Sequence, residues 1–296
     1  MTLPTPIHDP AQTRRSTLVG GTAILMWSSL ALLTVLAGPV PPFQLVAMAF
    51  SLATLIGVGL WIRQGGPWLR HLRLPWPVWV NGVVGLFGYH FFYFLAVGSA
   101  PAVEANLINY LWPLLIVLFS ALLPGEHLRW YHVVGALLGM AGAGLLILRG
   151  GRLDLDLRYV GGYGAALAAA VLWAAYSVIS RRFGMIPTQA VGGFCGVTAL
   201  LALLAHLAFE TTVWPTGWAW LAVLGLGLGP VGAAFFTWDV GVKHGNIRAL
   251  GALAYATPLL STFLLIGFGL AQPTWAVLAA CGLIVGGAVL AAGDLF

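Results

Sequence analysis

The chain of 296 residues is 60% hydrophobic and only 7% charged. A soluble domain carries about 25% charged residues, so this composition excludes an ordinary soluble protein and indicates an integral membrane protein in a lipid bilayer. The formal net charge is +5. The basic residues are few and lie in short segments instead of a patch, which excludes a nucleic acid partner.

The N-terminal segment, residues 1–16, is polar and contains prolines, and we predict a loose cytoplasmic tail. Arg14 and Arg15 precede an apolar run and superficially resemble a twin-arginine signal. That run is too long for the hydrophobic region of a signal peptide, and it has a counterpart in the second half of the chain. We therefore interpret it as the first retained transmembrane helix.

Ten segments are apolar enough to cross a bilayer, which requires about 20 residues per helix. Glycine and proline separate them, as at Gly38-Pro39 and Pro124-Gly125. The predicted spans are residues 17–37, 43–62, 76–97, 102–122, 130–148, 159–180, 188–209, 217–240, 247–270 and 273–292. The expected fold class is therefore an all-α integral membrane protein with ten transmembrane helices.

The ten segments form two related sets of five. The sequence NLINYLWP ends at Pro113 and GALAYATP ends at Pro258, so Tyr110 pairs with Tyr255 at an offset of 145 residues (255 − 110). The same or a nearby offset pairs Trp130 with Trp275, Gly142 with Gly287, Trp27 with Trp173, and Phe91-Phe92 with Phe235-Phe236. An internal repeat in a membrane-spanning chain is typical of a transporter.

The basic residues favour one orientation in the membrane. With the N-terminus in the cytoplasm, most of them lie inside, so the positive-inside rule places both termini in the cytoplasm. The inside residues are Arg14, Arg15, Arg63, Arg70, Arg73, Arg129, Arg181, Arg182, Lys243 and Arg248, and the outside ones are Arg149, Arg152 and Arg158.

Five helices per repeat is an odd number, so the second repeat must enter the membrane from the opposite side. The predicted organisation is a tail at 1–16, a first repeat at 17–148, a periplasmic linker at 149–158, a second repeat at 159–292 and a cytoplasmic tail at 293–296. Inverted repeats place a substrate site near mid-membrane, between the halves, and permit alternating access. The alternative is a duplication that is retained only for packing.

Ionisable groups inside a membrane are costly and are therefore functional candidates, but this chain has few. His90 is either a hydrogen-bonded packing residue or a group that handles substrate or protons. Asp239 and Lys243 are four residues apart and are predicted to form an interfacial ion pair, the alternative being a coupling site. No nucleophile with a base, no HExxH and no CxxC is visible, so we expect no catalytic residue, metal or cofactor.

Aromatic and weakly polar side chains occupy the predicted interior. Trp27, Trp112 and Trp173 lie deeper than tryptophans at span ends, such as Trp61 and Trp130, which suit the membrane interface. Helical spacing groups Trp173, Tyr176, Ser177 and Ser180 on the sixth span, Tyr89 and Tyr93 on the third, and Asn106, Asn109, Tyr110 and Pro113 on the fourth. Amides and hydroxyls are costly against lipid, so we expect them to face an internal, water-filled cavity.

Proline interrupts the fourth and ninth spans. Pro113 lacks an N–H and frees the carbonyl of Asn109, and Pro258 does the same in the second half. We expect a helix break at each proline that serves as a hinge and lets Tyr110 and Trp112 border one cavity. The alternative is that Trp112 packs against a neighbouring helix.

A cavity of aromatic rings, amides and hydroxyls with almost no fixed charge suits a neutral or zwitterionic amphipathic solute. Ring contacts contribute about 0.5–1.5 kcal/mol beyond area burial, and an ammonium group over a ring adds a similar amount. Aromatic amino acids satisfy both demands, whereas hydrophobic drugs and other amino acids satisfy them in part.

The stretch from Leu95 to Pro113, continuing to Gly125-Glu126, resembles the EamA-type ten-helix members of the drug/metabolite transporter superfamily. A weaker copy runs from Gly241 to Pro258. The similarity is closer to the YddG-type aromatic amino acid exporters, through residues 109–113, 173–176, 238–241 and 244–246. This resemblance implies export of aromatic amino acids across the inner membrane and a central cavity between the halves. It also implies that Tyr89, Tyr110, Trp112 and Trp173 line that cavity.

From the residues and the resemblance together, the predicted substrate-binding residues are Tyr89, His90, Asn109, Tyr110, Trp112, Trp173, Tyr176 and Trp27, with Pro113 and Pro258 as hinges. We expect a monomeric exporter of tryptophan, phenylalanine and tyrosine in a bacterial inner membrane. One alternative is a broad exporter of drugs or other amino acids. A distant one is a membrane enzyme or cofactor protein with His90 or His206 as a ligand.

Overall fold

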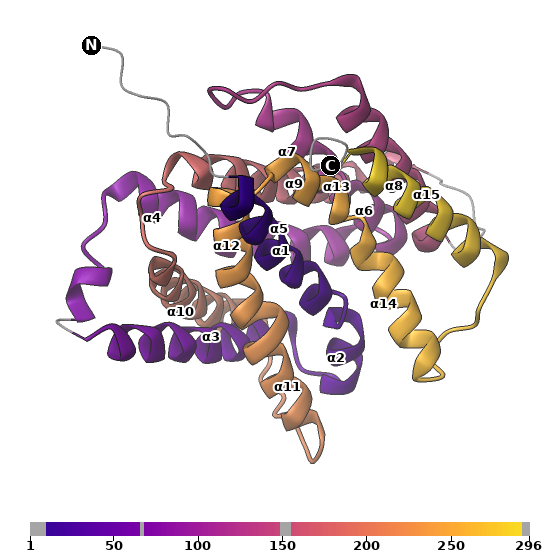
Figure 1. Cartoon of the computed structure of the whole chain (residues 1–296). Coiled ribbons are helices and arrows are strands. Elements are labelled where there is room, and N and C mark those ends of the chain that lie inside the picture. Colours follow the sequence, from indigo (N-terminus) through magenta and orange to yellow (C-terminus); the bar gives the residue numbers. More distant parts are fainter. Residues whose placement is uncertain (1–9, 66–67, 149–154, 292–296) are drawn as a thin grey trace, which may run out of the picture.

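The computed structural model describes residues 10–65, 68–148 and 155–291. Within these ranges all regular structure is helical, with no strand, and the helices pack into one bundle (Figure 1). The all-helical class is confirmed for this part of the chain. Residues 1–9 of the predicted tail, residues 149–154 of the predicted linker and the predicted tail at 293–296 lie outside the described residues.

Nine helical stretches in the described ranges are long and apolar enough to cross a membrane. They are Pro10–Ala37, Pro42–Gln64, Trp76–Ser99, Ala102–Ser120, Trp130–Leu148, Leu157–Arg182, Thr188–Phe209, Ala219–His244 and Ile247–Gly267. A further apolar helix, Trp275–Ala291, has 17 residues. Together they overlap the predicted spans in order, but the first helix starts at Pro10, inside the segment predicted as a loose tail.

Most of these stretches contain more than one helical element. The α-helices are α1 (Pro10–Trp27), α2 (Leu30–Ala37), α3 (Pro42–Gln64), α4 (Trp76–Val83), α5 (Tyr89–Ser99), α6 (Ala102–Asn109), α7 (Trp112–Ser120), α8 (Trp130–Leu148), α9 (Val160–Arg182), α10 (Val191–Phe209), α11 (Ala219–Leu228), α12 (Ala234–His244), α13 (Ile247–Leu253), α14 (Ala256–Gly267) and α15 (Trp275–Ala291). Short 3-10 turns lie at Trp68–His71, Leu157–Tyr159 and Thr188–Ala190.

Both predicted proline breaks are present. α6 ends at Asn109 and α7 begins at Trp112, just before Pro113, and the equivalent break before Pro258 separates α13 from α14. Proline cannot donate the N–H that a continuous helix requires, which explains both breaks. A third break, between α1 and α2 at Ser28-Ser29, was not predicted because no proline marks it.

Two π-helical segments occupy equivalent places in the two halves. Val84–Gly88 precedes α5 and Gly229–Ala233 precedes α12, an offset of 145 residues (229 − 84). With this offset of 145 residues, His90 corresponds to Phe235. The sequence alone pairs Phe91 with Phe235, so the two alignments differ by one residue. A π turn is one wide turn inserted into an α-helix, and no compositional pattern in this sequence marks it.

Helices of the first half pack against helices of the second half. α1 lies along α12, α5 along α9, α3 along α10, α8 along α15 and α7 along α13. Glycines lie at several crossings. A Cβ added to Gly20 would come within 2.7 Å of the Gly241 Cα, and one added to Gly57 within 2.5 Å of the Gly192 Cα. The halves therefore interlock through close backbone contact, as small residues permit in membrane helices.

The first helices of the two halves run in opposite directions. Near the start of α1, the Thr17 hydroxyl accepts a hydrogen bond from the Asn246 N–H at 2.8 Å. Near the end of α9, Arg181 donates to the carbonyl of the adjacent Gly245 at 2.7 Å. The start of α1 and the end of α9 thus meet at one end of the bundle, together with Arg248, and we call it the arginine-rich end.

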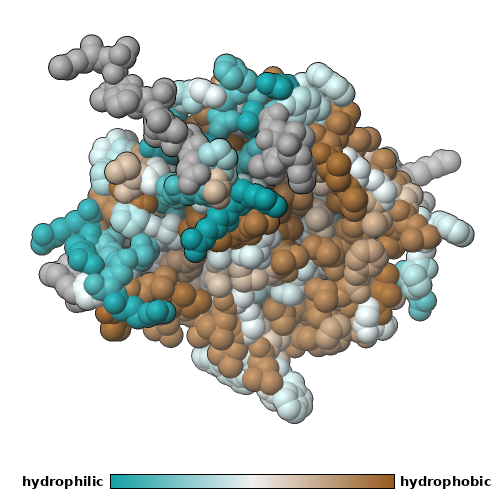
Figure 2. Space-filling view, in the orientation of Figure 1, coloured by the Kyte–Doolittle hydropathy of each residue, from teal (hydrophilic) through white to brown (hydrophobic). Residues whose placement is uncertain are grey.

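The surface is largely apolar, as a lipid-facing surface requires. Figure 2 shows hydrophobic residues over most of the centre, right and lower part of the view, hydrophilic residues gathered at the top and left, and smaller hydrophilic groups at the lowest tip and the right edge. Exposed tryptophans at or beside helix ends fit the predicted interface belt, including Trp76, Trp130 and Trp275. Trp61 does not fit it, because it is buried and its Nε1 donates to the Gln189 carbonyl at 2.9 Å.

The crossing of α3 and α10 generates a stability prediction. Gly57→Ala should destabilise the fold by about 1–3 kcal/mol, the typical cost of overpacking, because its Cβ would lie 2.5 Å from the Gly192 Cα. The thermal unfolding midpoint of the purified variant should fall. Gly59→Ala is the matched control on the same helix, since nothing lies within 4 Å of its Cβ. An unchanged midpoint for Gly57→Ala would mean that the helices do not meet there.

Candidate functional site

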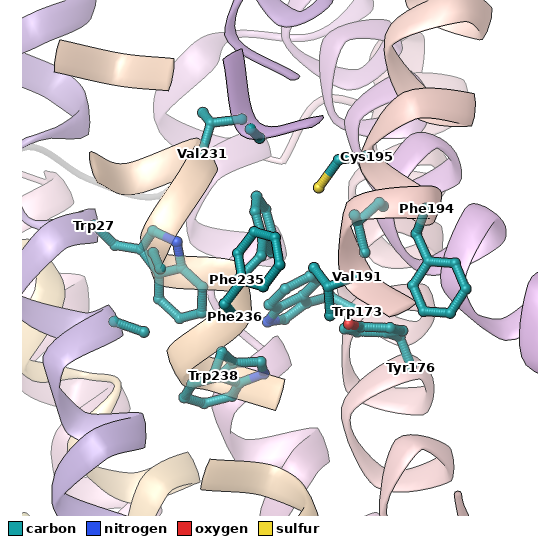
Figure 3. Close-up of a cluster of buried hydrophobic side chains, with 14 of the residues drawn as sticks. Trp27, Trp173, Tyr176, Val191, Phe194, Cys195, Val231, Phe235, Phe236 and Trp238 are labelled. Atoms are coloured by element: carbon teal, nitrogen blue, oxygen red, sulfur yellow. The ribbon is translucent and has the colours of Figure 1, made fainter. Parts of the chain in front are cut away.

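Four tryptophans from four helices meet inside the bundle. Trp27 on α1, Trp112 on α7, Trp173 on α9 and Trp238 on α12 form what we call the tryptophan cluster, and none is more than 7% exposed. The Trp27 ring centroid lies 6.1 Å from Trp112, 5.6 Å from Trp173 and 4.9 Å from Trp238. Figure 3 shows three of these rings converging from separate helices. Two come from each half, so the cluster marks the place where the halves meet.

Two of the indole N–H groups are held by hydrogen bonds across the core. Trp27 Nε1 donates to the Pro230 carbonyl at 3.0 Å, and Trp238 Nε1 donates to the Ser177 hydroxyl at 3.0 Å. Pro230 lies in the second π-helical segment, so this widened turn presents a carbonyl to a ring of the first half. Buried indole N–H groups need such partners, and these bonds fix the orientation of both rings.

Further aromatic rings extend the cluster on one side. Phe235 lies 5.6 Å from Trp173 and stacks on Phe50 at 5.4 Å with an interplanar angle of 27°. His90 meets Phe50 edge-on at 5.2 Å and lies 6.4 Å from Phe235. His90 and Phe235, paired by the π-segment register, thus touch each other, as Trp27 and Trp173 do.

His90 has a defined hydrogen-bonding state in this arrangement. Its Nδ1 lies 2.7 Å from the Leu86 carbonyl in the first π-helical segment. A carbonyl only accepts, so Nδ1 carries the proton in this contact. The half-buried ring therefore packs at the edge of the cluster and is held there by this hydrogen bond.

A polar group adjoins the tryptophan cluster on the side of α5 and α6. We call Tyr89, Tyr93, Asn106 and Asn109 the tyrosine–asparagine group. The two tyrosine rings stack at 6.0 Å, and the Tyr93 hydroxyl donates to Asn106 Oδ1 at 2.9 Å. Asn109 Nδ2 donates to the Tyr89 hydroxyl at 3.4 Å. The Tyr89 ring lies 5.5 Å from Trp173, so the polar group and the cluster are continuous.

Asn109 carries the least satisfied polar atom of this group. The residue is 4% exposed, and its Oδ1 is buried with no hydrogen-bond partner among the described residues. A buried acceptor without a partner costs about 1–3 kcal/mol. Such an oxygen is suited to receive a hydrogen bond from a cationic or hydroxyl donor on a solute.

The structure separates Tyr110 from Trp112. Trp112 belongs to the tryptophan cluster, whereas Tyr110 packs with Tyr255 and Leu259 in a second hydrophobic cluster between the halves. The two rings thus pack in different hydrophobic clusters, and the break between α6 and α7 does not bring them into one cluster. Trp112 instead packs against tryptophans of neighbouring helices.

Seven of the eight predicted binding residues form one chain of ring contacts and hydrogen bonds, and Tyr110 lies near it, within electrostatic range of Tyr89 and Tyr93. The connected residues are Trp27, Tyr89, His90, Asn109, Trp112, Trp173 and Tyr176. Trp238 and Phe235 are central to the cluster but are not among the predicted binding residues. The register of 145 residues takes Tyr93 onto Trp238, and that relation could have identified it.

In this conformation the tryptophan rings contact one another. Two surface hollows lie away from them. One of about 410 Å³ is a groove between α3 and α10, lined among others by Ser51, Thr54 and Gly196. Another of about 380 Å³ is lined among others by Gln64 and Pro187. Edge-to-face packing is favourable for rings, so the four rings stabilise one another at the place where the halves meet.

The arginine-rich end is joined by ion pairs between the halves. Glu126, which follows α7, binds Arg181 through Oε1 at 2.9 Å and Arg248 through Oε2 at 3.2 Å. Arg248 also donates to the His127 carbonyl at 2.5 Å. The three charged side chains, which we call the arginine-rich network, are 14–17% exposed. Partial burial weakens the screening that makes surface ion pairs ineffective.

The predicted Asp239–Lys243 pair is formed, at 2.8 Å, and both side chains are buried. Asp239 also accepts from the Thr188 hydroxyl, and Lys243 also donates to the Ile186 carbonyl. All four residues belong to the second half. The pair therefore ties α12 to the turn between α9 and α10 within that half.

The groups considered as cofactor or metal ligands have other partners. His206 bonds Glu210 through Nδ1 and Thr212 through Nε2, each at 2.9 Å. Across residues 10–65, 68–148 and 155–291, no three His, Cys, Asp or Glu side chains are grouped as a metal ion would require.

The hydrogen bond of Trp238 can be tested by removing its acceptor. Ser177→Ala should destabilise the protein by about 1–3 kcal/mol, because it leaves a buried indole N–H unpaired. Thermal unfolding in detergent measures the loss. Ser51→Ala is the control, because Ser51 bonds only within its own helix and lies at the surface. Equal midpoints for the two variants would contradict the bond.

Two comparisons place this architecture among known proteins. The model of the EamA-like transporter family matches residues 16–148 and again residues 160–293. A protein of known crystal structure, 55% identical in sequence, superimposes with a TM-score of 0.91 over 94% of this chain and 96% of its own.

Curated relatives are similar over most of their length. The aromatic amino acid exporter YddG of Ancylobacter novellus is 56% identical over 93% of this chain and 96% of its own. The protein of the same name from Salmonella typhimurium is 28% identical over 85% of this chain and 87% of its own. A probable terminal-alkyne amino-acid exporter of Streptantibioticus cattleyicolor is 25% identical over 73% of each chain.

Proposed function

The chain belongs to the EamA-like transporter family, and on that premise we propose that it exports aromatic amino acids from the cytoplasm of a bacterium. The observation that carries this proposal is a cluster of tryptophans from both halves that adjoins the unpartnered Asn109 Oδ1. Family membership makes the chain an integral membrane transporter, so a membrane enzyme is set aside. The relatives named as aromatic amino acid exporters support the substrate class.

The proposed architecture is two inverted repeats of five transmembrane helices, residues 17–148 and 159–292, joined by a linker at 149–158. The opposite directions of α1 and α9 support it, as do the matching π segments and proline breaks of the two halves. The helix α15 would be the tenth span, since 17 residues rise about 26 Å, close to the roughly 30 Å of a bilayer core.

The proposed orientation puts the arginine-rich end in the cytoplasm of the cell, with the protein in the inner membrane. The excess of Lys and Arg at that end supports this through the positive-inside rule. The tails at 1–16 and 293–296 are then both cytoplasmic. A monomer is the proposed working unit, because the tryptophan cluster is built entirely from one chain.

The solute would be recognised at two places, its aromatic ring and its polar head. The indole, phenyl or phenol of the solute would insert among Trp27, Trp112 and Trp173, exchanging one ring contact for another. Its ammonium group would donate to Asn109 Oδ1, with the hydroxyl of Tyr89 beside it. The rings are now in mutual contact, so binding requires the two halves to separate slightly at the cluster.

Alternating access would move the halves about this cluster. The breaks at Pro113 and Pro258 would act as hinges, because the backbone there is already freed from helical hydrogen bonds. The arginine-rich network would hold the cytoplasmic end closed in the conformation described. Opening that end must break the pairs of Glu126 with Arg181 and Arg248.

A broader amino acid exporter is the second candidate. The relative named as a terminal-alkyne amino-acid exporter favours it, and ring contacts discriminate weakly at about 0.5–1.5 kcal/mol each. Counterflow of labelled tryptophan in proteoliposomes separates the two. Competition by phenylalanine and tyrosine but not by leucine or alanine supports aromatic export, equal competition by all four supports the broader function, and absence of counterflow contradicts both.

The tryptophan cluster can be tested by truncating one ring. Trp112→Ala should lower tryptophan counterflow roughly three- to tenfold, the equivalent of one lost ring contact. Trp275→Ala is the matched control, because Trp275 is 85% exposed at the start of α15. Both variants are checked for an unaltered elution profile. Counterflow that Trp112→Ala leaves at the unsubstituted level would remove the cluster from the binding site.

The role of the arginine-rich network is tested by labelling. Ser120 is fully buried on the face of α7 that meets α13, so a cysteine there reports opening of this end. With Cys195 and Cys281 replaced by Ala, Glu126→Gln should speed maleimide labelling of Ser120→Cys roughly tenfold, because it weakens charged hydrogen bonds.

The matched control for this labelling experiment is Glu104→Gln. Glu104 lies on the first turn of α6, at the opposite end of the bundle, and its Oε2 has no partner among the described residues. Its replacement should leave the labelling rate unchanged. A rate that Glu126→Gln also leaves unchanged would mean that the network does not close this end.

A further inference from the structure

We propose that Tyr255 and Tyr110 form a reciprocal latch that alternates with the conformation of the transporter. In the conformation described, the Tyr255 hydroxyl holds the backbone N–H of Leu114. In the opposite conformation, the Tyr110 hydroxyl holds the N–H of Leu259. The inference rests on the proposed inverted repeats and alternating access. It adds a hydrogen bond between the halves that is made by Tyr255 in one conformation and by Tyr110 in the other.

The formed half of the latch crosses between the repeats. The Leu114 N–H donates to the Tyr255 hydroxyl at 3.2 Å. Leu114 directly follows Pro113 in the first turn of α7, where helical N–H groups have no partner within the helix. The hydroxyl of a residue from the second half therefore caps a helix of the first half, and the cap holds the two repeats together at this point.

The surroundings of Tyr255 are built for this contact. Its side chain is fully buried, and Gly139 leaves the room that its ring occupies, since a Cβ there would come within 2.6 Å of the ring. A hydroxyl in such a site must have a hydrogen-bond partner or pay the full cost of desolvation. The Leu114 N–H supplies that partner only while the repeats stay together.

The other half of the latch has the same parts, unjoined. Leu259 directly follows Pro258 just as Leu114 follows Pro113, and the 145-residue offset relates Tyr110 to Tyr255 and Leu114 to Leu259. Tyr110 is half-buried, and its hydroxyl makes no hydrogen bond within the described part of the chain. All four residues lie in or against one hydrophobic cluster, so the second contact needs a shift of the halves and no refolding.

The two ends of the bundle also differ in burial and in ion pairs, in the direction that the latch requires. Ser120, beyond the latch toward the arginine-rich end, is fully buried, whereas its repeat partner Leu265 is half-buried. The repeat partner of Glu126 is Ala271, so the arginine-rich network has no equivalent at the opposite end. The hydrogen bond of Tyr255 is therefore formed while the arginine-rich end is closed. The hydrogen bond of Tyr110 is not formed, and the opposite end is the less tightly packed one.

Removing each hydroxyl in turn tests the latch. With Cys195 and Cys281 replaced by Ala, labelling rates are measured without solute for Ser120→Cys and, separately, Leu265→Cys. Tyr255→Phe should speed labelling at 120 and slow it at 265, by roughly three- to tenfold, the range of one hydrogen bond. Tyr110→Phe should shift both rates in the opposite directions.

Two further variants make the test decisive. Gly139→Ala displaces the Tyr255 ring and should act in the same direction as Tyr255→Phe, which gives a second reading should that variant fold poorly. Tyr131→Phe removes a surface hydroxyl that accepts from Arg129 and should change neither rate.

The outcomes separate the latch from the proposed function. Opposite shifts from the two tyrosine variants support the latch. Shifts of the same sign, or no shift in either, overturn it, even where tryptophan counterflow of the unsubstituted protein is intact. Because labelling needs no solute, absence of counterflow contradicts the proposed function without bearing on the latch.

Discussion

The structure depends on one constraint: inside a bilayer no water is present to satisfy polar groups or backbone bonds. The two halves therefore meet through rings, glycines and a small number of fully assigned hydrogen bonds. Tryptophan meets this demand, because it offers a large apolar face and a single N–H. Trp27 and Trp238 each place that N–H on an acceptor contributed by the second half. The centre of the molecule is thus aromatic.

The same constraint makes every departure from the α-helix informative. The widened turn at Gly229–Ala233 offers a carbonyl to Trp27, and the one at Val84–Gly88 offers a carbonyl to His90. The break before Pro113 offers an N–H that Tyr255 accepts. Each of these three irregularities is thus satisfied by a side chain nearby, whereas Asn109 Oδ1 is among the buried side-chain atoms that have no partner in the described part of the chain. An unsatisfied acceptor beside a wall of rings is what a solute with a ring and an ammonium group would complete.

Much of this architecture follows from the sequence, because apolar runs and prolines act locally. The order of the helices, the breaks before Pro113 and Pro258, and the burial of Trp27 and Trp173 all follow from patterns a few residues long. The π-helical segments do not, since a wide turn has no compositional mark. The directions of Tyr110 and Trp112 depend on how α6 and α7 rejoin after the break, which only packing decides. Glu126 meets Arg181 and Arg248 through the packing of the two halves, a relation between residues far apart in the chain.

The central claim is that a solute binds where the two halves meet, between the tryptophan cluster and Asn109. The most direct measurement is an experimental structure of the protein with bound tryptophan. The account predicts the indole of the solute among Trp27, Trp112 and Trp173, with its ammonium group within hydrogen-bond distance of Asn109 Oδ1. Tryptophan bound elsewhere, with the four rings of the cluster still in mutual contact, would contradict it.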